Sequence, residues 1–263
     1  MKLLKLKTLL RLAGNVDLFS TEENFKYFSY PKLYWRLNRY SASSIRDGVG
    51  QLVKSGHVAK IMRNYRPNFR LTEVGKEELL LKFAVSRNKG RWDKTWRVVV
   101  IDSKRTSKSE VRWLRSQLKQ FGCRNLERGV YVTPLNISKG IKDVLLRQSL
   151  LGGVTVLETK KFVVGDDKAF ASIVWELDEL VEAYLEFVSL SAKLIRVVRS
   201  GKELTDKLKR EFVSVSDRWF ELLSVDPGLP TGLLPKDWGF EEAKSNYLKL
   251  AESVWELEEE EAS

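Results

Sequence analysis

Residues 41–63 read SASSIRDGVGQLVKSGHVAKIMR, and this stretch predicts a helix followed by a strand. Its apolar residues recur at positions i, i+4, i+7 and i+8, which places them on one helical face: Ile45, Val49, Leu52 and Val53. Ser41 or Ser43 can cap the start of this helix. Ser55-Gly56 can end it, because glycine tolerates the left-handed conformation found at helix ends. Residues 57–62 then have the composition of a β-strand.

The segments on either side extend this pattern into a small α+β unit. Leucines at helical spacing predict a helix before Gly14, and Pro31 stands where a second helix can begin. Behind the strand, a turn-rich stretch at 63–68 leads to a second short strand at 69–72 and to another helix. Three helices and a two-stranded ribbon with a basic tip follow the order of a winged helix-turn-helix, which we expect over residues 1–90.

Polar and charged side chains occupy the face of residues 43–54 that lies opposite the apolar stripe. Glutamine suits the adenine edge, arginine the guanine edge and lysine a phosphate, so this face fits the major groove of DNA. The residues expected to contact DNA here are Ser43, Ser44, Arg46, Asp47, Gln51 and Lys54.

The ribbon tip is a second candidate contact. We expect it to reach phosphates or a minor groove through Arg63, Tyr65 and Arg66, with an ordinary solvated turn as the alternative. The basic stretch 84–91 is expected to link two domains and to touch DNA.

Two glycines, Gly48 and Gly50, interrupt the same predicted helix. A glycine inside a helix costs roughly 1 kcal/mol relative to alanine. The missing side chain at Gly50 would allow a nucleic-acid backbone to approach closely. Alternatively, the two glycines mark a weak helix that packs on a neighbouring element.

Residues 91–168 alternate strands and helices. Strands are predicted at 95–101, near 123–126, at 129–134 and at 154–164. One helix begins at Ser107 or Ser109 and ends at Gly122, and a second begins at Ser138. The resulting order β-α-β-β-α-β predicts a ferredoxin-like domain, in which Cys123 is expected to be buried.

Residues 169–263 are predicted to be helical. We expect one long helix from Phe170 to Val198, a second from Leu204 to Val225, and a last helix from Phe240 into an acidic end at 258–261. That acidic end is expected to be a frayed, solvated tail. The whole chain is thus predicted to be an α+β multidomain protein with domains at 1–90, 91–168 and 169–263.

The charge is divided unevenly along the chain. Residues 1–90 hold 18 Lys and Arg against 7 Asp and Glu, and residues 91–168 hold 17 against 8. Residues 169–263 hold 11 against 20. Two basic segments followed by an acidic one indicate a polyanion partner for the first two and a different role for the third.

Several classes of protein are excluded or disfavoured by composition. A single cysteine and a single histidine exclude an intramolecular disulfide, a cysteine-based zinc cluster and a two-histidine metal site. The chain has no glycine-rich phosphate loop or nucleophile elbow, so we expect no conventional enzyme, no cofactor and no metal site. The start resembles no secretory signal and the apolar runs are too short to span a membrane, which predicts a cytoplasmic protein.

Three sets of residues carry a resemblance to a known family. The loop Asp226-Pro227-Gly228-Leu229-Pro230, followed by Leu233-Leu234-Pro235-Lys236-Asp237-Trp238, resembles the "DP-x-LP…LLP-x-DW" signature of the PaaX family of GntR-like repressors. Trp92…Trp96-Arg97 and Gly129-Val130-Tyr131-Val132-Thr133-Pro134 are similar to the Cas2-like central domain of that family. The winged helix, the Cas2-like domain and the helical domain follow in the family's order over the whole chain. Gly239 departs from the pattern, since the family usually has proline after the signature tryptophan.

The resemblance implies a function. Members are homodimeric transcriptional repressors that bind double-stranded DNA at a palindromic operator, and an acyl-coenzyme A effector releases the DNA in characterised members. On this basis Trp219, Pro235 and Trp238 are expected to bind the effector, with a structural role in the helical core as the alternative.

Two further functions remain open. Asp102 closes the first strand of the Cas2-like domain where Cas2 proteins carry a metal-binding carboxylate, so a metal-dependent nuclease is one alternative. A simpler role for Asp102 is to cap the turn that follows. The other alternative is a non-regulatory, CRISPR-type or architectural module that holds duplex backbone through Arg112, Arg115, Lys119 and Arg124.

Overall fold

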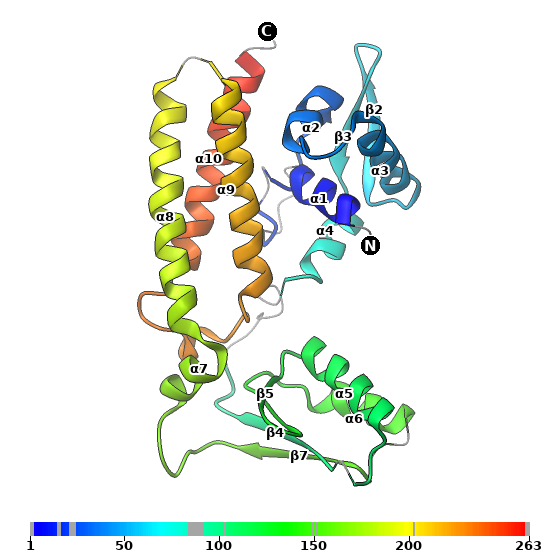
Figure 1. Ribbon diagram of the computed structural model, residues 1–263, viewed down its shortest axis with the longest axis vertical. Helices are drawn as coiled ribbons and strands as arrows, with labels where there is room; N and C mark the ends of the chain where they lie inside the picture. Colours follow the sequence, from blue (N-terminus) through cyan, green and yellow to red (C-terminus); the bar gives the residue numbers. More distant parts are fainter. Residues whose placement is uncertain are drawn as a thin grey trace. The chain divides into compact units, whose positions relative to one another are not determined.

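The computed structural model describes residues 3–14, 17–20, 25–83, 92–102, 104–148, 150, 152–201 and 203–260. The chain forms two compact units, and Figure 1 shows the elements of each. Unit 1 consists of Met1–Ser86, Glu182–Asp226 and Trp238–Ser263, and unit 2 of Arg87–Val181 and Pro227–Asp237. Most of the last third of the chain, expected as a separate domain, therefore lies in the same unit as the first third, whereas residues 169–181 and 227–237 belong to unit 2. The predicted linker at 84–91 lies outside the described residues.

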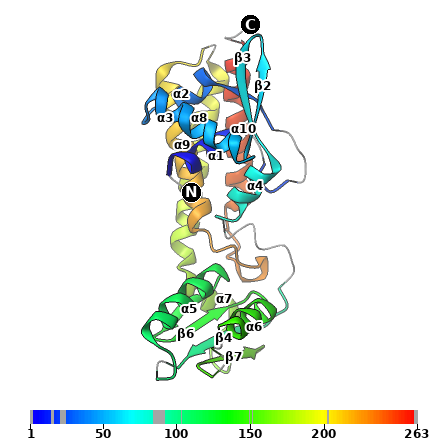
Figure 2. The same ribbon diagram turned by 90° about the vertical axis from the view of Figure 1, so that its right-hand side faces the viewer.

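The described residues of the N-terminal part of unit 1 form four helices and three strands. They are α1 (Leu3–Leu12), β1 (Phe28–Ser29), α2 (Tyr30–Arg36), α3 (Ala42–Lys54), β2 (Val58–Arg63), β3 (Arg66–Leu71) and α4 (Glu73–Leu80). The strands form an antiparallel sheet in the order β1-β3-β2. This succession of helices and this sheet are those of a winged helix, with β2 and β3 as the wing (Figure 2).

Local sequence explains where α3 and the wing begin and end. The hydroxyl of Ser41 accepts a 3.2 Å hydrogen bond from the backbone N–H of Ser44, so Ser41 is the cap of α3. The wing turn is tighter than expected, because β3 begins at Arg66 and only Asn64 and Tyr65 separate the strands. Both turn residues have positive φ, as a type I′ hairpin turn requires.

The C-terminal part of unit 1 is a bundle of three helices, α8 (Leu177–Ser200), α9 (Asp206–Val225) and α10 (Phe240–Glu260). Its apolar residues and those of the winged helix belong to one continuous core. The ring of Phe28 packs edge-on against Trp255 of α10, and that of Trp35 lies 5.9 Å from Phe212 of α9. The winged helix is therefore packed directly on the bundle (Figure 1).

The acidic end of α10 is part of this packing. Glu258 is buried, and its carboxylate accepts hydrogen bonds from the guanidinium of Arg36 and from the indole N–H of Trp35. Glu259 pairs with Lys32 of α2. The prediction of a frayed, solvated tail is wrong for Glu258, which is buried against a cation 222 positions away in the sequence, whereas Glu259 is exposed.

Unit 2 contains a four-stranded antiparallel sheet in the order β5-β6-β4-β7. Its elements are β4 (Trp96–Ile101), α5 (Lys108–Gln120), β5 (Arg124–Glu127), β6 (Val130–Thr133), α6 (Ser138–Arg147), β7 (Val154–Thr159) and α7 (Asp167–Trp175). Helices α5 and α6 cover one face of the sheet and form a core with it (Figure 2). This is the predicted ferredoxin-like arrangement. Ser107 rather than Ser109 caps α5, and β7 ends at Thr159.

The structure divides one predicted helix into two helices. Instead of a single helix from Phe170 to Val198, α7 ends at Trp175 and α8 begins at Leu177. Glu176, between them, has a φ of 54° in the left-handed region, which ends a helix. A short 3₁₀ helix, η2 (Thr231–Leu233), lies in the loop before α10. Within the described part of the chain, no helix combines the length and the apolar character needed to cross a membrane.

Candidate nucleic-acid interface

The outer face of α3 is open. Arg46, Asp47, Gln51 and Lys54 are exposed there, and none of the charged ones among them forms an ion pair with another described residue. The inner face is occupied by the buried side chains of Ile45, Val49 and Leu52. Four of the residues expected to contact DNA are thus brought together on one accessible surface, as an α-helix that enters a major groove requires.

Ser43 and Ser44 differ from the other four predicted residues. The hydroxyl of Ser43 lies 3.0 Å from that of Ser41, and the hydroxyl of Ser44 accepts a 2.9 Å hydrogen bond from Ser41. Ser44 is also only partly exposed. Both serines therefore belong to the hydrogen-bonded start of α3.

The two glycines of α3 have different surroundings. A Cβ added at Gly48 would lie 3.5 Å from the side chain of Leu4, so this residue packs on α1. A Cβ added at Gly50 would meet nothing within 4 Å, and Gly50 is exposed on the same face as Gln51 and Lys54. Gly48 therefore lies in the contact between α3 and α1, whereas Gly50 faces open space.

The wing presents its predicted residues to solvent. Arg63, Tyr65 and Arg66 are exposed, and Tyr65 is 100% exposed at the turn. Tyr65 also has a φ of 57°, which favours glycine over a bulky residue. An aromatic residue held in such a conformation, with its ring entirely in solvent, contributes nothing to the core and is available to a partner.

Tyr27 is a residue of this surface that sequence reasoning missed. The guanidinium of Arg63 lies 4.5 Å from the centre of the Tyr27 ring, and that of Arg70 lies 5.3 Å from it. Both contacts have the geometry of cation–π interactions and orient the arginines of the wing. Tyr27 precedes β1, which joins the sheet beside β3, so only the strand pairing reveals this contact.

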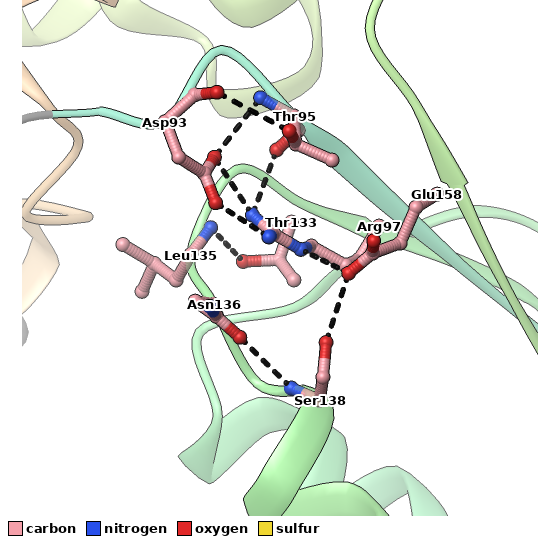
Figure 3. Close-up of polar contacts among 8 residues, drawn as sticks. All are labelled: Asp93, Thr95, Arg97, Thr133, Leu135, Asn136, Ser138 and Glu158. Atoms are coloured by element: carbon pink, nitrogen blue, oxygen red, sulfur yellow. Dashed lines mark hydrogen bonds and ion pairs between the residues drawn. The ribbon is translucent and has the colours of Figure 1, made fainter.

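Unit 2 contains a polar network around Arg97 (Figure 3). Arg97 is only 3% exposed, and its guanidinium donates to both carboxylate oxygens of Asp93 and to Glu158 of β7. Ser138 at the start of α6 donates a 2.9 Å hydrogen bond to Glu158. The network thereby joins β4, β7 and α6.

Electrostatics in this network follow from the same contacts. Hydrogen bonding from Arg97 lowers the pKa of Asp93, and hydrogen bonding from Ser138 and Arg97 lowers the pKa of Glu158. Hydrogen bonding to Asp93 raises the pKa of Arg97. Each nitrogen of the guanidinium has a partner, so the network is structural.

Comparison with protein families gives two matches that lie in sequence order. Residues 89–171 match the PaaX protein central Cas2-like domain, and residues 175–261 match the PaaX-like protein C-terminal domain. Together the two ranges span more than half of the chain. The chain belongs to the PaaX family. These matches support a regulator of the PaaX type in the broad sense. Neither match covers the winged helix, which is assigned from its helices and its sheet.

One solved structure shares the fold of this PaaX-family chain. It is the uncharacterized protein Rv0674 from Mycobacterium tuberculosis, with a TM-score of 0.54 and 18% sequence identity over 83% of each chain. At this identity the likeness shows the fold alone. The comparison with curated proteins gave no match.

Asp102, on which the alternative of a nuclease depends, lies at the start of a turn. Its carboxylate accepts a 2.8 Å hydrogen bond from the backbone N–H of Lys104 and lies 3.5 Å from the guanidinium nitrogen of Arg105. Among the described residues, no group of three or more His, Cys, Asp or Glu side chains could hold a metal ion. The observed contacts are those of a turn cap.

Part of the PaaX signature serves the core of unit 1. The buried carboxylate of Asp226 accepts a 2.6 Å hydrogen bond from the hydroxyl of Tyr184, and burial raises the pKa of that hydroxyl. The ring of Trp238 packs edge-on against Tyr184. A Cβ at Gly239 would lie 2.9 Å from the Cβ of Tyr184, so this close approach explains the glycine where the family usually has proline.

Two of the three residues expected to bind the effector lie in unit 1: Trp219 belongs to its core and Trp238 packs against that core. Trp219 is buried between Phe187 and Tyr247 in unit 1, and the cavity beside it has a volume of about 10 Å³, enough for about one water. Trp238 is partly exposed in unit 1, whereas Pro235 belongs to unit 2. The cavity beside Trp219 is too small for an acyl-coenzyme A.

Proposed function

We propose that this protein is a DNA-binding transcriptional repressor that acts in the cytoplasm as a homodimer on a palindromic operator. The observation that carries the proposal is the outer face of α3, which is exposed, polar and free of ion pairs with other described residues. Two copies related by a two-fold axis would place their α3 helices in successive major grooves of one duplex. Membership of the PaaX family supports the regulatory role.

The residues of this surface have distinct tasks in the proposal. Arg46 and Gln51 read base edges, because arginine pairs with guanine and glutamine with adenine in two-point hydrogen bonds. Lys54, Arg63 and Arg66 neutralise phosphates, which fixes register and makes affinity fall steeply with salt. The effector part of the proposal, release of DNA by an acyl-coenzyme A, rests on family membership alone.

Selection of bound fragments from random-sequence duplex DNA tests the proposal. We expect the unmodified chain to recover an inverted repeat, with half-sites one or more helical turns apart. The double variant Arg46→Ala/Gln51→Ala should lose preference within the repeat, whereas Lys54→Ala should weaken binding to all sequences alike. Recovery of no common sequence, or an equal loss of specific and random binding in the double variant, contradicts the proposed docking.

A further inference from the structure

Helix α5 of unit 2 carries a row of four cations. Lys108, Arg112, Arg115 and Lys119 occupy positions i, i+4, i+7 and i+11. With 3.6 residues per turn, this spacing keeps all four within an arc of about 60°. All four side chains are exposed, and none forms an ion pair with another described residue. We call these four residues the α5 row.

The row is not neutralised by its own helix. Glu110 is the acidic residue of α5, and its carboxylate accepts a 2.7 Å hydrogen bond from the backbone N–H of Ser107 in the capping box at the helix start. Glu110 lies on the other side of the helix, about 160° from Lys108 by the helical repeat. The row therefore presents positive charge alone.

Such a row lowers the stability of the helix that carries it. Like charges at i and i+4 destabilise a helix by about 0.2–0.5 kcal/mol per pair, and the row contains two such pairs, Lys108 with Arg112 and Arg115 with Lys119. An ordinary solvated helix face intersperses both signs of charge. No ion pair with a described residue of unit 2 offsets this repulsion, so an anionic partner would relieve it.

The geometry points to a second nucleic-acid contact: we propose that the α5 row binds the phosphate backbone of duplex DNA without regard to sequence, outside the contacts made by α3 and the wing. The row is about 16 Å long at a rise of 1.5 Å per residue, which matches about five base-pair steps of B-DNA. Guanidinium groups bind phosphate in a two-point geometry, and lysine adds point charges. This inference rests on the proposed function, because it extends the DNA contact to the Cas2-like unit.

A four-fold charge-removal variant of the full chain tests the row. It carries Lys108→Gln, Arg112→Gln, Arg115→Gln and Lys119→Gln, since glutamine is a good helix former. The matched control removes four other exposed cations without ion pairs among the described residues, on α8 and α9: Lys193→Gln, Arg196→Gln, Lys207→Gln and Arg210→Gln. Both variants lose four positive charges, so a difference in their DNA affinity shows that the place of the charges matters.

Affinity for a fluorescein-labelled 40-base-pair duplex of mixed sequence is measured by anisotropy at several salt concentrations. The row variant should bind at least tenfold more weakly than the parent at about 0.1 M salt, and the slope of log affinity against log salt should fall by about 2 to 4. The control should stay within twofold of the parent. Thermal unfolding should show the row variant to be at least as stable as the parent.

The outcomes separate the two proposals. Failure of the unmodified chain to bind the duplex overturns the proposed function and this inference with it. If the row variant binds DNA with the same affinity and the same salt dependence as the unmodified chain, while Lys54→Ala weakens binding, the inference is overturned and the proposed function is not. Sedimentation measures the oligomeric state of the row variant. A changed oligomeric state with unchanged DNA binding would assign the row to a contact between copies of the chain, and this result also overturns the inference.

Discussion

Arg36 and Glu258 form a buried, two-point ion pair that joins α2 to α10. The contacts measure 2.6 Å from Nη1 to Oε1 and 2.7 Å from Nη2 to Oε2, and the two side chains are 2% and 5% exposed. The guanidinium also lies 4.0 Å from the centre of the Trp35 ring. A buried ion pair contributes little net stability over an apolar pair, but removal of one partner leaves an unpaired charge in the core.

Glu258→Gln should therefore destabilise unit 1 by about 3–5 kcal/mol, because the buried guanidinium of Arg36 loses its counter-charge. Urea unfolding followed by far-ultraviolet circular dichroism measures the change. The control is Glu256→Gln, which removes an exposed carboxylate two residues earlier on α10 and should change stability by less than about 0.5 kcal/mol. Equal effects of the two variants would show that the ion pair does not hold α2 to α10.

Gly50→Ala should make the protein more stable and a weaker DNA binder. An alanine at this open position raises helix stability by up to about 1 kcal/mol, since nothing within 4 Å opposes the new Cβ. The same methyl group would obstruct the close approach of DNA to α3, so affinity for duplex should fall severalfold. Gly48→Ala is the matched control: it faces Leu4 of α1 and should leave DNA affinity unchanged. If Gly50→Ala binds duplex DNA as tightly as the unmodified chain, Gly50 is not needed for the close approach of DNA to α3.

The Arg97 network should make unit 2 acid-sensitive. The pKa values of Asp93 and Glu158 are lowered in the folded state, so their contribution to stability is present above the unfolded pKa values, near 4, and is lost as pH falls through the folded values. Urea midpoints measured between pH 6 and pH 2 should fall, and Asp93→Asn should make that pH dependence shallower. Asp143→Asn, at an exposed carboxylate of α6, should keep the parental dependence, and identical slopes in both variants would argue against the network.

Gly239→Ala should destabilise unit 1 by about 1–3 kcal/mol. Its Cβ would lie 2.9 Å from the Cβ of Tyr184, an atom close to the backbone that cannot move aside without shifting α8. Gly232→Ala is the control, because the nearest atom to its Cβ is a ring carbon of Trp92 at 3.8 Å. Differential scanning calorimetry of the two variants compares the effects. A melting temperature equal to that of the control would show that Tyr184 does not exclude a side chain at position 239.

Local signals predict much of this fold. The apolar spacing in α3, its serine cap and the glycine that ends it are read from neighbouring residues, and so is the β-α-β-β-α-β order of unit 2. The polar face of α3 follows from the same periodicity, since the residues opposite a buried stripe must face outward.

The features that sequence reasoning missed depend on distant partners. Glu258 looks like part of a solvated acidic run until α2 places Arg36 against it. Tyr27 has no signal of its own, because its role arises from the pairing of β1 with β3. Glu176 interrupts a continuous helical pattern because its backbone has a positive φ, and the spacing of apolar residues gives no sign of this conformation.

The shared core of the winged helix and the bundle also bears on how the protein is made. Arg36 and Glu258 are 222 residues apart, and at a synthesis rate of roughly 5–20 residues per second the ribosome needs on the order of ten seconds or more to deliver the second after the first. During that interval the nascent chain exposes the apolar surface that α9 and α10 later cover. A product cut short before α10 would therefore keep that apolar surface exposed and be open to aggregation.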